Sequence, residues 1–313
     1  MIVALSGGIG GAKLALGLSR VLDPERLLVV ANTGDDFEHL GLAISPDIDT
    51  LTYVLAGLDN QELGWGRRDE TWSFMETLDL LGAETWFRLG DRDLALHVER
   101  TRRLRAGEAL SAITADVCRR LGVRPRVLPA SDDPVRTKVR VDEGWIDFQD
   151  YFVRRRCAPA IRGLAFEGVE RARAHPDFLA ALVEAEAVVI CPSNPLISIE
   201  PILAIPRVRE ELARTRAPVV AVSPIIGGRA VKGPTAKMMA ELGRRPSARA
   251  AAERYADVLD IFVADSADAA DVDDLPQRVV LAPTLMTTLA EKEALARVAL
   301  VAAGVAMDRA GAS

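Results

Sequence analysis

Residues 1–22, MIVALSGGIGGAKLALGLSRVL, set the class of fold expected for this chain. An apolar run predicts a short strand, the glycine-rich segment after it predicts a loop, and the leucines that follow recur at helical spacing. A second apolar run, residues 26–32 (RLLVVAN), brings the chain back to the sheet and is followed by polar residues. Strand, loop, helix and strand in this order predict a parallel α/β sheet whose loops open on one edge.

Further apolar runs extend this sheet. They are residues 185–195 (AEAVVICPSNP), 217–228 (APVVAVSPIIGG), 259–266 (LDIFVADS) and 278–286 (RVVLAPTLM), and segments with helical spacing lie among them. We therefore predict a doubly wound, mostly parallel Rossmann-like sheet of five to six strands. Residues 124–167 alternate apolar and polar side chains, which predicts a small appended α+β subdomain with antiparallel strands. The core would then comprise residues 1–123 and 168–313.

The composition excludes several classes of protein. Of 313 residues, 49% are hydrophobic and 27% are charged, which is typical of a globular chain. The formal net charge of -6 argues against broad nucleic-acid binding, because such binding needs a basic surface. No apolar run is long enough to cross a membrane, and no basic leader precedes the first apolar run, so we expect a cytoplasmic protein without a membrane partner.

The glycine-rich loop is the first candidate for chemistry. Gly7, Gly8, Gly10 and Gly11 stand between a strand and a helix, where backbone amides and the helix N-terminus favour an anion, and Lys13 adds a positive charge for phosphate. The loop lacks the Gly-Lys-Ser/Thr of a Walker A motif, and Lys13 stands where a dinucleotide fingerprint needs a third small residue. The alternative is a tight turn that packs the helix on the strand.

Four carboxylates follow the second strand within 15 residues: Asp35, Asp36, Asp47 and Asp49. Because like charges at this density repel one another, we interpret them as a site for a hard divalent cation such as Mg²⁺, shared with phosphate oxygens. Asp35 and Asp49 rank first among them. In the alternative interpretation, Asp49 caps a helix that starts at Thr50, and Asp35 is a ribose ligand as in dinucleotide enzymes.

Two segments mix tryptophans with charges, residues 64–72 (GWGRRDETW) and 84–93 (ETWFRLGDRD). Such a mixture suits a flat aromatic ligand, because an indole stacks on a ring while Arg and Asp bind the polar edges of the ligand. In the alternative, the tryptophans fill a core and the charges are solvated. Ser193 and Asn194 and, further along, Gly228 follow predicted strands and point to the same edge of the sheet.

Seven motifs in order give the chain a family resemblance. GGIGGAK, NTGDD, PDIDT, GWGRRDETW, ETWFRLGDRDLA, SNP and SPIIGG resemble the 2-phospho-L-lactate transferases, the CofD family with its actinobacterial FbiA type, over about residues 2 to 230. The resemblance implies a Mg²⁺-dependent transferase that dimerises. It would move a phospholactate, phosphoenolpyruvate or phosphoglycerate group from a guanosine diphosphate-linked donor to the ribityl hydroxyl of the deazaflavin Fo, releasing GMP.

The resemblance also implies roles for particular residues. Lys13 and the four glycines would face the donor phosphates, and the catalytic residues would be Asp35, Asp49 and Lys13. The metal ligands would be Asp35, Asp47 and Asp49, with Asp36 beside them. The deazaflavin pocket would comprise Trp65, Arg67, Asp69, Glu70, Thr71, Trp86 and Asp91, and the guanosine would lie by Ser193, Asn194 and Gly228.

Two other functions stay open from the residues. One is a non-catalytic nucleotide-binding regulator like the related bacterial morphology proteins, which resemble this glycine loop and sheet. The two tryptophan-containing segments argue against it, because a regulator needs no deazaflavin pocket. The other is an NAD-dependent oxidoreductase, which only analogy of fold favours.

Overall fold

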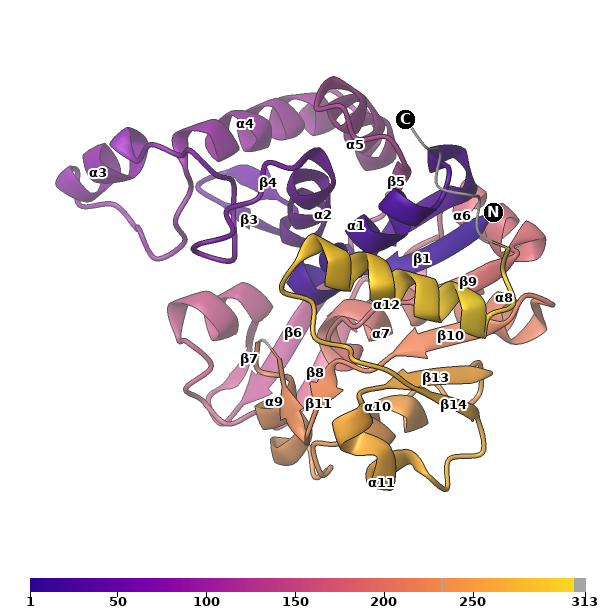
Figure 1. The fold of residues 1–313 in the computed structure, drawn as a ribbon. Helices are drawn as coiled ribbons and strands as arrows, with labels where there is room; N and C mark the ends of the chain where they lie inside the picture. Colours follow the sequence, from indigo (N-terminus) through magenta and orange to yellow (C-terminus); the bar gives the residue numbers. More distant parts are fainter. Residues whose placement is uncertain (232, 307–313) are drawn as a thin grey trace.

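A computed structural model describes residues 1–231 and 233–306, and it confirms the α/β class with a large parallel sheet (Figure 1). The sheet has the strand order β14-β13-β10-β9-β1-β2-β5, and every neighbouring pair is parallel. Its strands are β1 (Ile2–Ser6), β2 (Leu27–Ala31), β5 (Arg126–Pro129), β9 (Ala187–Ile190), β10 (Val219–Val222), β13 (Ile261–Ala264) and β14 (Arg278–Leu281).

The sheet has seven strands where the sequence predicted five to six, and β5 accounts for the difference. Only four residues long, β5 lies in the segment that the sequence grouped with the antiparallel unit, but it pairs with β2 in the register Leu28↔Arg126. Length does not set it apart, since β9, β10, β13 and β14 are equally short; β5 was missed because its residues run into the alternating pattern that follows. The antiparallel sheet itself begins ten residues later, at Arg136.

Helices cover both faces of the main sheet. The α-helices of the described residues are α1 (Gly8–Val21), α2 (Pro46–Ala56), α3 (Ser73–Leu80), α4 (Asp91–Arg105), α5 (Leu110–Arg120), α6 (Pro176–Glu184), α7 (Glu200–Leu203), α8 (Val208–Arg214), α9 (Thr235–Glu241), α10 (Ala248–Glu253), α11 (Ala269–Val272) and α12 (Leu289–Ala302), of which α3 and α9 pack away from the main sheet. Alternate residues of β1 enter different cores: Ile2 and Ala4 pack with α1, α2 and α12, and Val3 and Leu5 pack with α6 and α8. Burial on both faces explains why the strands read as continuous apolar runs.

Smaller antiparallel sheets lie at the edge of the main sheet where its strands end. They are β7-β6-β8, made of β6 (Arg136–Val141), β7 (Gly144–Asp147) and β8 (Gly163–Glu167); β3 (Phe37–His39) with β4 (Leu42–Ile44); and β11 (Ile225–Ile226) with β12 (Arg229–Ala230). Figure 1 shows α3 projecting from the body beyond β3 and β4. Its C-terminal end exposes Leu80 and Leu81.

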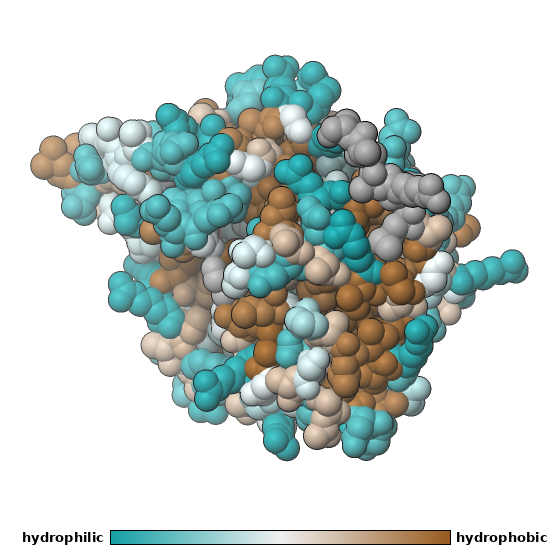
Figure 2. Space-filling model, in the orientation of Figure 1, coloured by the Kyte–Doolittle hydropathy of each residue, from teal (hydrophilic) through white to brown (hydrophobic). Residues whose placement is uncertain are grey.

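The last helix completes one face of the core. α12 starts at a capping box in which the Thr288 side chain and Glu291 exchange hydrogen bonds with each other's backbone amides. It then packs on α1 at Gly17, where any side chain would overlap the Lys292 backbone. Figure 2 shows apolar side chains gathered beside α12, over β13 and β14, and polar ones over α4. Within the described residues, no helix combines the length and apolar character needed to cross a bilayer.

Candidate functional site

The strand order reverses between β1 and β9, and the loops after these two strands meet there. From β1 the chain proceeds to β2 and β5 on one side, and β9, β10, β13 and β14 lie on the other side. The Gly7 amide donates a hydrogen bond of 3.0 Å to Ser193 Oγ, which joins the glycine-rich segment to the loop after β9. Such a reversal is where open α/β sheets bind ligands. Two predicted binding residues are therefore brought together.

The glycines allow α1 to approach that loop closely. α1 begins at Gly8, so Gly10 and Gly11 lie in its first turn and not in a loop as predicted. A methyl group on Gly10 would overlap the Pro192 carbonyl oxygen, and one on Gly11 would overlap Ser193 Oγ. At these two positions the alternative of tight packing describes what the structure shows.

The Asp47 carboxylate binds the backbone amide at the N-terminus of α1. Its Oδ1 accepts a 2.6 Å hydrogen bond from the Gly8 amide, and its Oδ2 accepts one of 2.9 Å from Asn32 Nδ2. Burial raises the pKa of Asp47 to about 6 even though both donors favour the charged form. The carboxylate thus lies against the glycines, as the sequence predicted.

Asp35 adds negative charge close to Asp47, and Asp36 is the next residue of the chain. Burial, and then repulsion from Asp47, raises the pKa of Asp35 well above its usual value, although Gln149 Nε2 donates to its Oδ1 at 2.9 Å. Burial likewise raises the pKa of Asp36 to about 7. Asp36 Oδ2 accepts from Ser45 Oγ, whereas its buried Oδ1 has no hydrogen-bond partner in the described chain. Asp35 and Asp47 repel each other, whereas the guanidinium groups of Arg136 and Arg100 partly offset the effect of burial on Asp36.

Asp49 lies in a different environment. Both of its oxygens accept hydrogen bonds from the buried guanidinium of Arg100, and His97 Nδ1 lies 3.8 Å from its Oδ2. On its other side His97 lies 3.2 Å from Asp93, which accepts a 2.6 Å hydrogen bond from Tyr53. The negative charge of Asp49 is therefore compensated inside the protein.

The structure does not bring Asp49 together with Asp35 and Asp47. α2 begins at Pro46, not at Thr50, so Asp47 and Asp49 both lie in its first turn and Asp49 is not its cap. Residues two apart in a helix point about 200° apart, which sends the two carboxylates to different sides. In the described residues, no group of three or more His, Cys, Asp and Glu side chains is placed to hold a metal ion. A metal here would need ligand oxygens in addition to Asp35 and Asp47.

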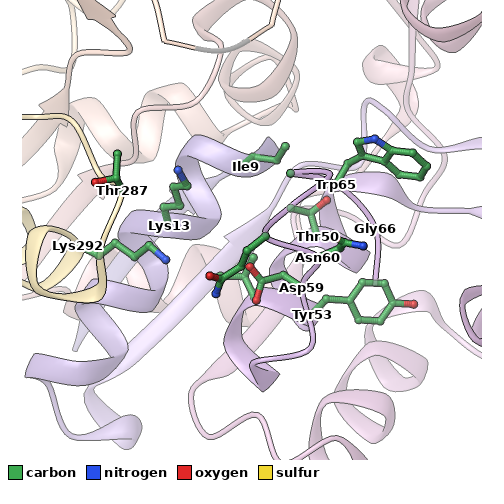
Figure 3. A pocket seen from close by; sticks show the side chains of 13 residues that line it. Ile9, Lys13, Thr50, Tyr53, Asp59, Asn60, Trp65, Gly66, Thr287 and Lys292 are labelled. Carbon is green, nitrogen blue, oxygen red and sulfur yellow. The ribbon is translucent and has the colours of Figure 1, made fainter. Parts of the chain in front are cut away.

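A cavity of about 170 Å³ opens beside the start of α1 (Figure 3). It is lined by Ile9, Lys13, Thr50, Tyr53, Val54, Asp59, Asn60, Gln61, Gly64, Trp65, Gly66, Thr287 and Lys292. Lys13 does not point to the glycine amides, because its Nζ donates to the Met286 carbonyl oxygen at 2.8 Å. The Trp65 side chain is 44% exposed and is therefore accessible to a ligand.

Two of the acids predicted to bind a deazaflavin instead cap helices. Glu70 accepts from the amides of Arg92 and Asp93 at the start of α4, at 2.8 and 2.9 Å. Asp91 accepts from Thr71 Oγ1 and from the first amides of α3. Each carboxylate satisfies amides that the first turn of a helix leaves unpaired. Both acids therefore have a structural role.

The remaining aromatic-segment residues are spread over separate places. Arg67 lines a small cavity of about 10 Å³ next to Trp65. Asp69 has an exposed side chain and a backbone φ of 57°. Trp86 packs edge-on against His39 with ring centroids 5.0 Å apart, in an aromatic cluster under β3. Of the predicted pocket residues, Trp65, Arg67 and Glu70 thus line one small cavity, and their contact with a deazaflavin stays a prediction.

Two of the residues predicted to contact the guanosine form hydrogen bonds within the protein. Asn194 Oδ1 accepts from the Leu196 amide and caps the helical turn that follows β9. The Gly228 amide donates to Asp268 Oδ1 at 3.1 Å, in the turn between β11 and β12. Ser193 is the one residue of this predicted set that the structure joins to the glycine segment.

Sequence reasoning missed the residues that hold the carboxylates. Asn32 and Gln149 bind Asp47 and Asp35, and no pattern marks Gln149, which comes from the antiparallel unit 114 residues away from Asp35. Arg100 could have been identified from the sequence, because Asp93, His97 and Arg100 are spaced to lie on one face of a helix.

Comparison with known proteins identifies similar chains. The family model of 2-phospho-L-lactate transferase CofD matches residues 2–279. A phosphoenolpyruvate transferase of Kitasatospora aureofaciens is 41% identical, with 96% of this chain and 97% of the relative covered. A 2-phospho-L-lactate transferase of Methanosarcina mazei is 39% identical, with 96% and 100% covered. A solved structure of an upf0052 family member from Bacillus halodurans superposes with a TM-score of 0.62 over 96% of this chain and 99% of that one, and its 14% identity shows likeness of fold alone.

Proposed function

The chain belongs to the 2-phospho-L-lactate transferase CofD family, and from this membership we propose a specific transfer reaction. The group moved is a phospho-three-carbon acid, which is phospholactate, phosphoenolpyruvate or phosphoglycerate. The donor links this group to guanosine diphosphate, the acceptor is the ribityl hydroxyl of the deazaflavin Fo, and GMP is released. The family match confirms the resemblance that the seven motifs indicated.

The observation that carries the proposal is the excess of negative charge beside the N-terminus of α1. Asp36 and Asp47 are buried and Asp35 is half-buried, and the loss of water around them raises the pKa of each carboxyl group. Two carboxylates with hard oxygen atoms suit Mg²⁺, which takes its other ligands from phosphate and water. Asp35 and Asp47 would hold the ion, and it would neutralise charge on the diphosphate when bound. The predicted role of Asp49 as a metal ligand stays a prediction.

The chain's own groups then have defined tasks. The new bond joins the ribityl oxygen to the phosphorus that bears the three-carbon acid, and the broken bond releases the bridging oxygen with its electron pair as part of GMP. A primary alcohol is a weak nucleophile, so the protein must hold it in line with that phosphorus. A carboxylate of the acidic group accepts the proton that the alcohol loses.

Release of GMP tests the proposal. Protein, Fo and Mg²⁺ are mixed with each of the three guanylylated donors, and GMP is measured over time. We expect release with at least one donor, loss of release in Asp47→Asn, and normal release in Asp177→Asn, which removes a carboxylate from an exposed ion pair. Failure of all three donors would reject the transfer reaction.

Fluorescence of Fo separates the transferase from the regulator. A transferase must bind the acceptor, so titration of Fo with protein should change the blue-region fluorescence of the deazaflavin, and a regulator should not. Thermal stabilisation by NAD but not by GDP would instead revive the oxidoreductase.

A further inference from the structure

Lys292 is a buried lysine whose charge has no partner in the described protein. Its side chain is 7% exposed, and it forms no hydrogen bond or ion pair with residues 1–231 or 233–306. Its Nζ is not among the fully buried side-chain atoms that lack a partner, so the ammonium group itself reaches accessible space. Its ammonium group belongs to the lining of the cavity beside α1, which is where a compensating charge could enter.

The backbone of Lys292 is held rigidly in place. The capping box at Thr288 and Glu291 fixes the first turn of α12, and Lys292 is the next residue of that turn. On the other side, the Lys292 backbone packs on Gly17 of α1 so closely that no side chain would fit there. Lys13 lies one helical turn before Gly17, so both lysines come from the contact between α1 and α12. Their positions are preorganised for a ligand.

The cavity around these lysines has an anion-binding character. Figure 3 shows Lys292 extending from α12 toward the loop of Asp59 and Asn60, with Lys13 rising from α1 beside Thr287. Of the described residues that line the cavity, Asp59 is the one acidic side chain, against two lysines. Hydroxyl and amide groups from Thr50, Thr287 and Asn60 complete the polar wall. Trp65 and Tyr53 come from the opposite side in the same view.

The size of the cavity limits its occupant. A cavity of about 170 Å³ that is open to solvent has room for a single phosphate or a three-carbon acid, with the rest of a larger ligand outside it. We propose that Lys292, together with Lys13, forms an oxyanion subsite that receives a compact phosphate or carboxylate group of the ligand beside Trp65. Only the source of that oxyanion rests on the proposed transfer reaction.

Binding of small anions tests the subsite without turnover. Inorganic phosphate, lactate, phosphoenolpyruvate and GDP are titrated separately into the wild type, and intrinsic fluorescence and calorimetry report binding. Trp65→Phe shows how much of the fluorescence change arises in the cavity. Lys292→Met keeps the aliphatic stem and removes the charge, Lys292→Arg keeps the charge, and Arg297→Gln removes an exposed cation from the same helix.

We expect Lys292→Met to weaken binding of at least one of these anions about tenfold, with Lys292→Arg and Arg297→Gln close to wild type. Weaker GDP binding assigns the subsite to a phosphate of the nucleotide. Weaker binding of lactate or phosphoenolpyruvate, with GDP unchanged, assigns it to the three-carbon acid. The Tm of Lys292→Met should stay close to that of the wild type, because Met keeps the buried aliphatic stem, and this shows that the variant folds.

Equal affinities of wild type and Lys292→Met for all four anions would overturn the proposal, as would no saturable binding to wild type up to about 10 mM. These results differ from failure of the transfer reaction. A protein that binds anions through Lys292 but releases no GMP would refute the reaction and leave the subsite intact.

Discussion

The first turn of α2 contributes one carboxylate to each of two acidic regions. The two regions differ in how far nearby cations balance their negative charge. Asp47 points to the glycines, and Asp35 and Asp36 add charge that the protein offsets only in part, through Arg136 and Arg100 on the Asp36 side. Asp49 points to α4, where Arg100 binds both of its oxygens and His97 lies beside it. We call these the uncompensated group and the compensated group. Carboxylates two residues apart thus have different tasks, one suited to a cation ligand and the other to holding α4 against α2.

The largest effect should follow loss of a carboxylate from the uncompensated group. Asp47→Asn removes charge from the proposed ion site, and we expect turnover to fall about 10⁴-fold, which corresponds to about 5.5 kcal/mol. The variant should stay folded, because Asn keeps an acceptor for the Gly8 amide. Steady-state GMP release at saturating and limiting Mg²⁺ measures the effect, with circular dichroism as the check on folding.

The companion variant Asp49→Asn tests whether the two acidic groups really have different tasks. If Asp49 only compensates Arg100, the variant should lose stability more than activity. A stable Asp49→Asn protein with lost Mg²⁺ dependence would show instead that Asp49 binds the metal, as the sequence predicted.

Loss of the Arg100 cation from the compensated group should lower the stability of the protein. Arg100→Met leaves Asp49 buried without a partner, so we expect the free energy of unfolding to fall by about 3–5 kcal/mol. Urea denaturation measures the change. The double variant Arg100→Met/Asp49→Leu should recover most of it, because both charges are then absent. A single variant as stable as wild type would mean that the ion pair does not compensate Asp49.

The uncompensated group should make stability depend on pH in metal-free protein. The pKa values of Asp36 and Asp47, about 7 and about 6, lie above the unfolded value of 3.8, so the folded state binds more protons between these limits. The free energy of unfolding should therefore fall as pH rises from about 4 to about 7, by several kcal/mol. Chemical denaturation in EDTA at several pH values measures this slope. Asp36→Asn should flatten it, and an unchanged slope would contradict the assignment.

The smallest effect should come from the cap that orients α4. Glu70 accepts the amides of Arg92 and Asp93, so Glu70→Ala should lower the free energy of unfolding by about 1 kcal/mol. Thermal unfolding measures it, and Glu70→Gln, which retains an acceptor, should lose less. If Glu70→Ala instead weakens Fo binding with no loss of stability, Glu70 contacts the ligand as the resemblance implied.

Local patterns predicted much of the fold because they depend on neighbours in the chain. The apolar run of β1, the glycines and the helix after them were evident, and Asp47 reaches the glycines as expected. The four-residue strand β5 was missed, since its membership of the sheet depends on pairing with β2. The helix caps at Glu70 and Asp91 were also missed, because each bonds to amides about twenty residues away.

The sequence alone determined the parallel α/β architecture, the family and the presence of an acidic group near a glycine-rich turn. These follow from periodicity and from residue types at short spacing. Tertiary structure alone decided which carboxylates stay uncompensated. Arg100 lies 51 residues from Asp49 and Gln149 lies 114 from Asp35, and Lys292 packs on Gly17 from the far end of the chain. Charge balance depends on distance in space, which chain order does not reveal.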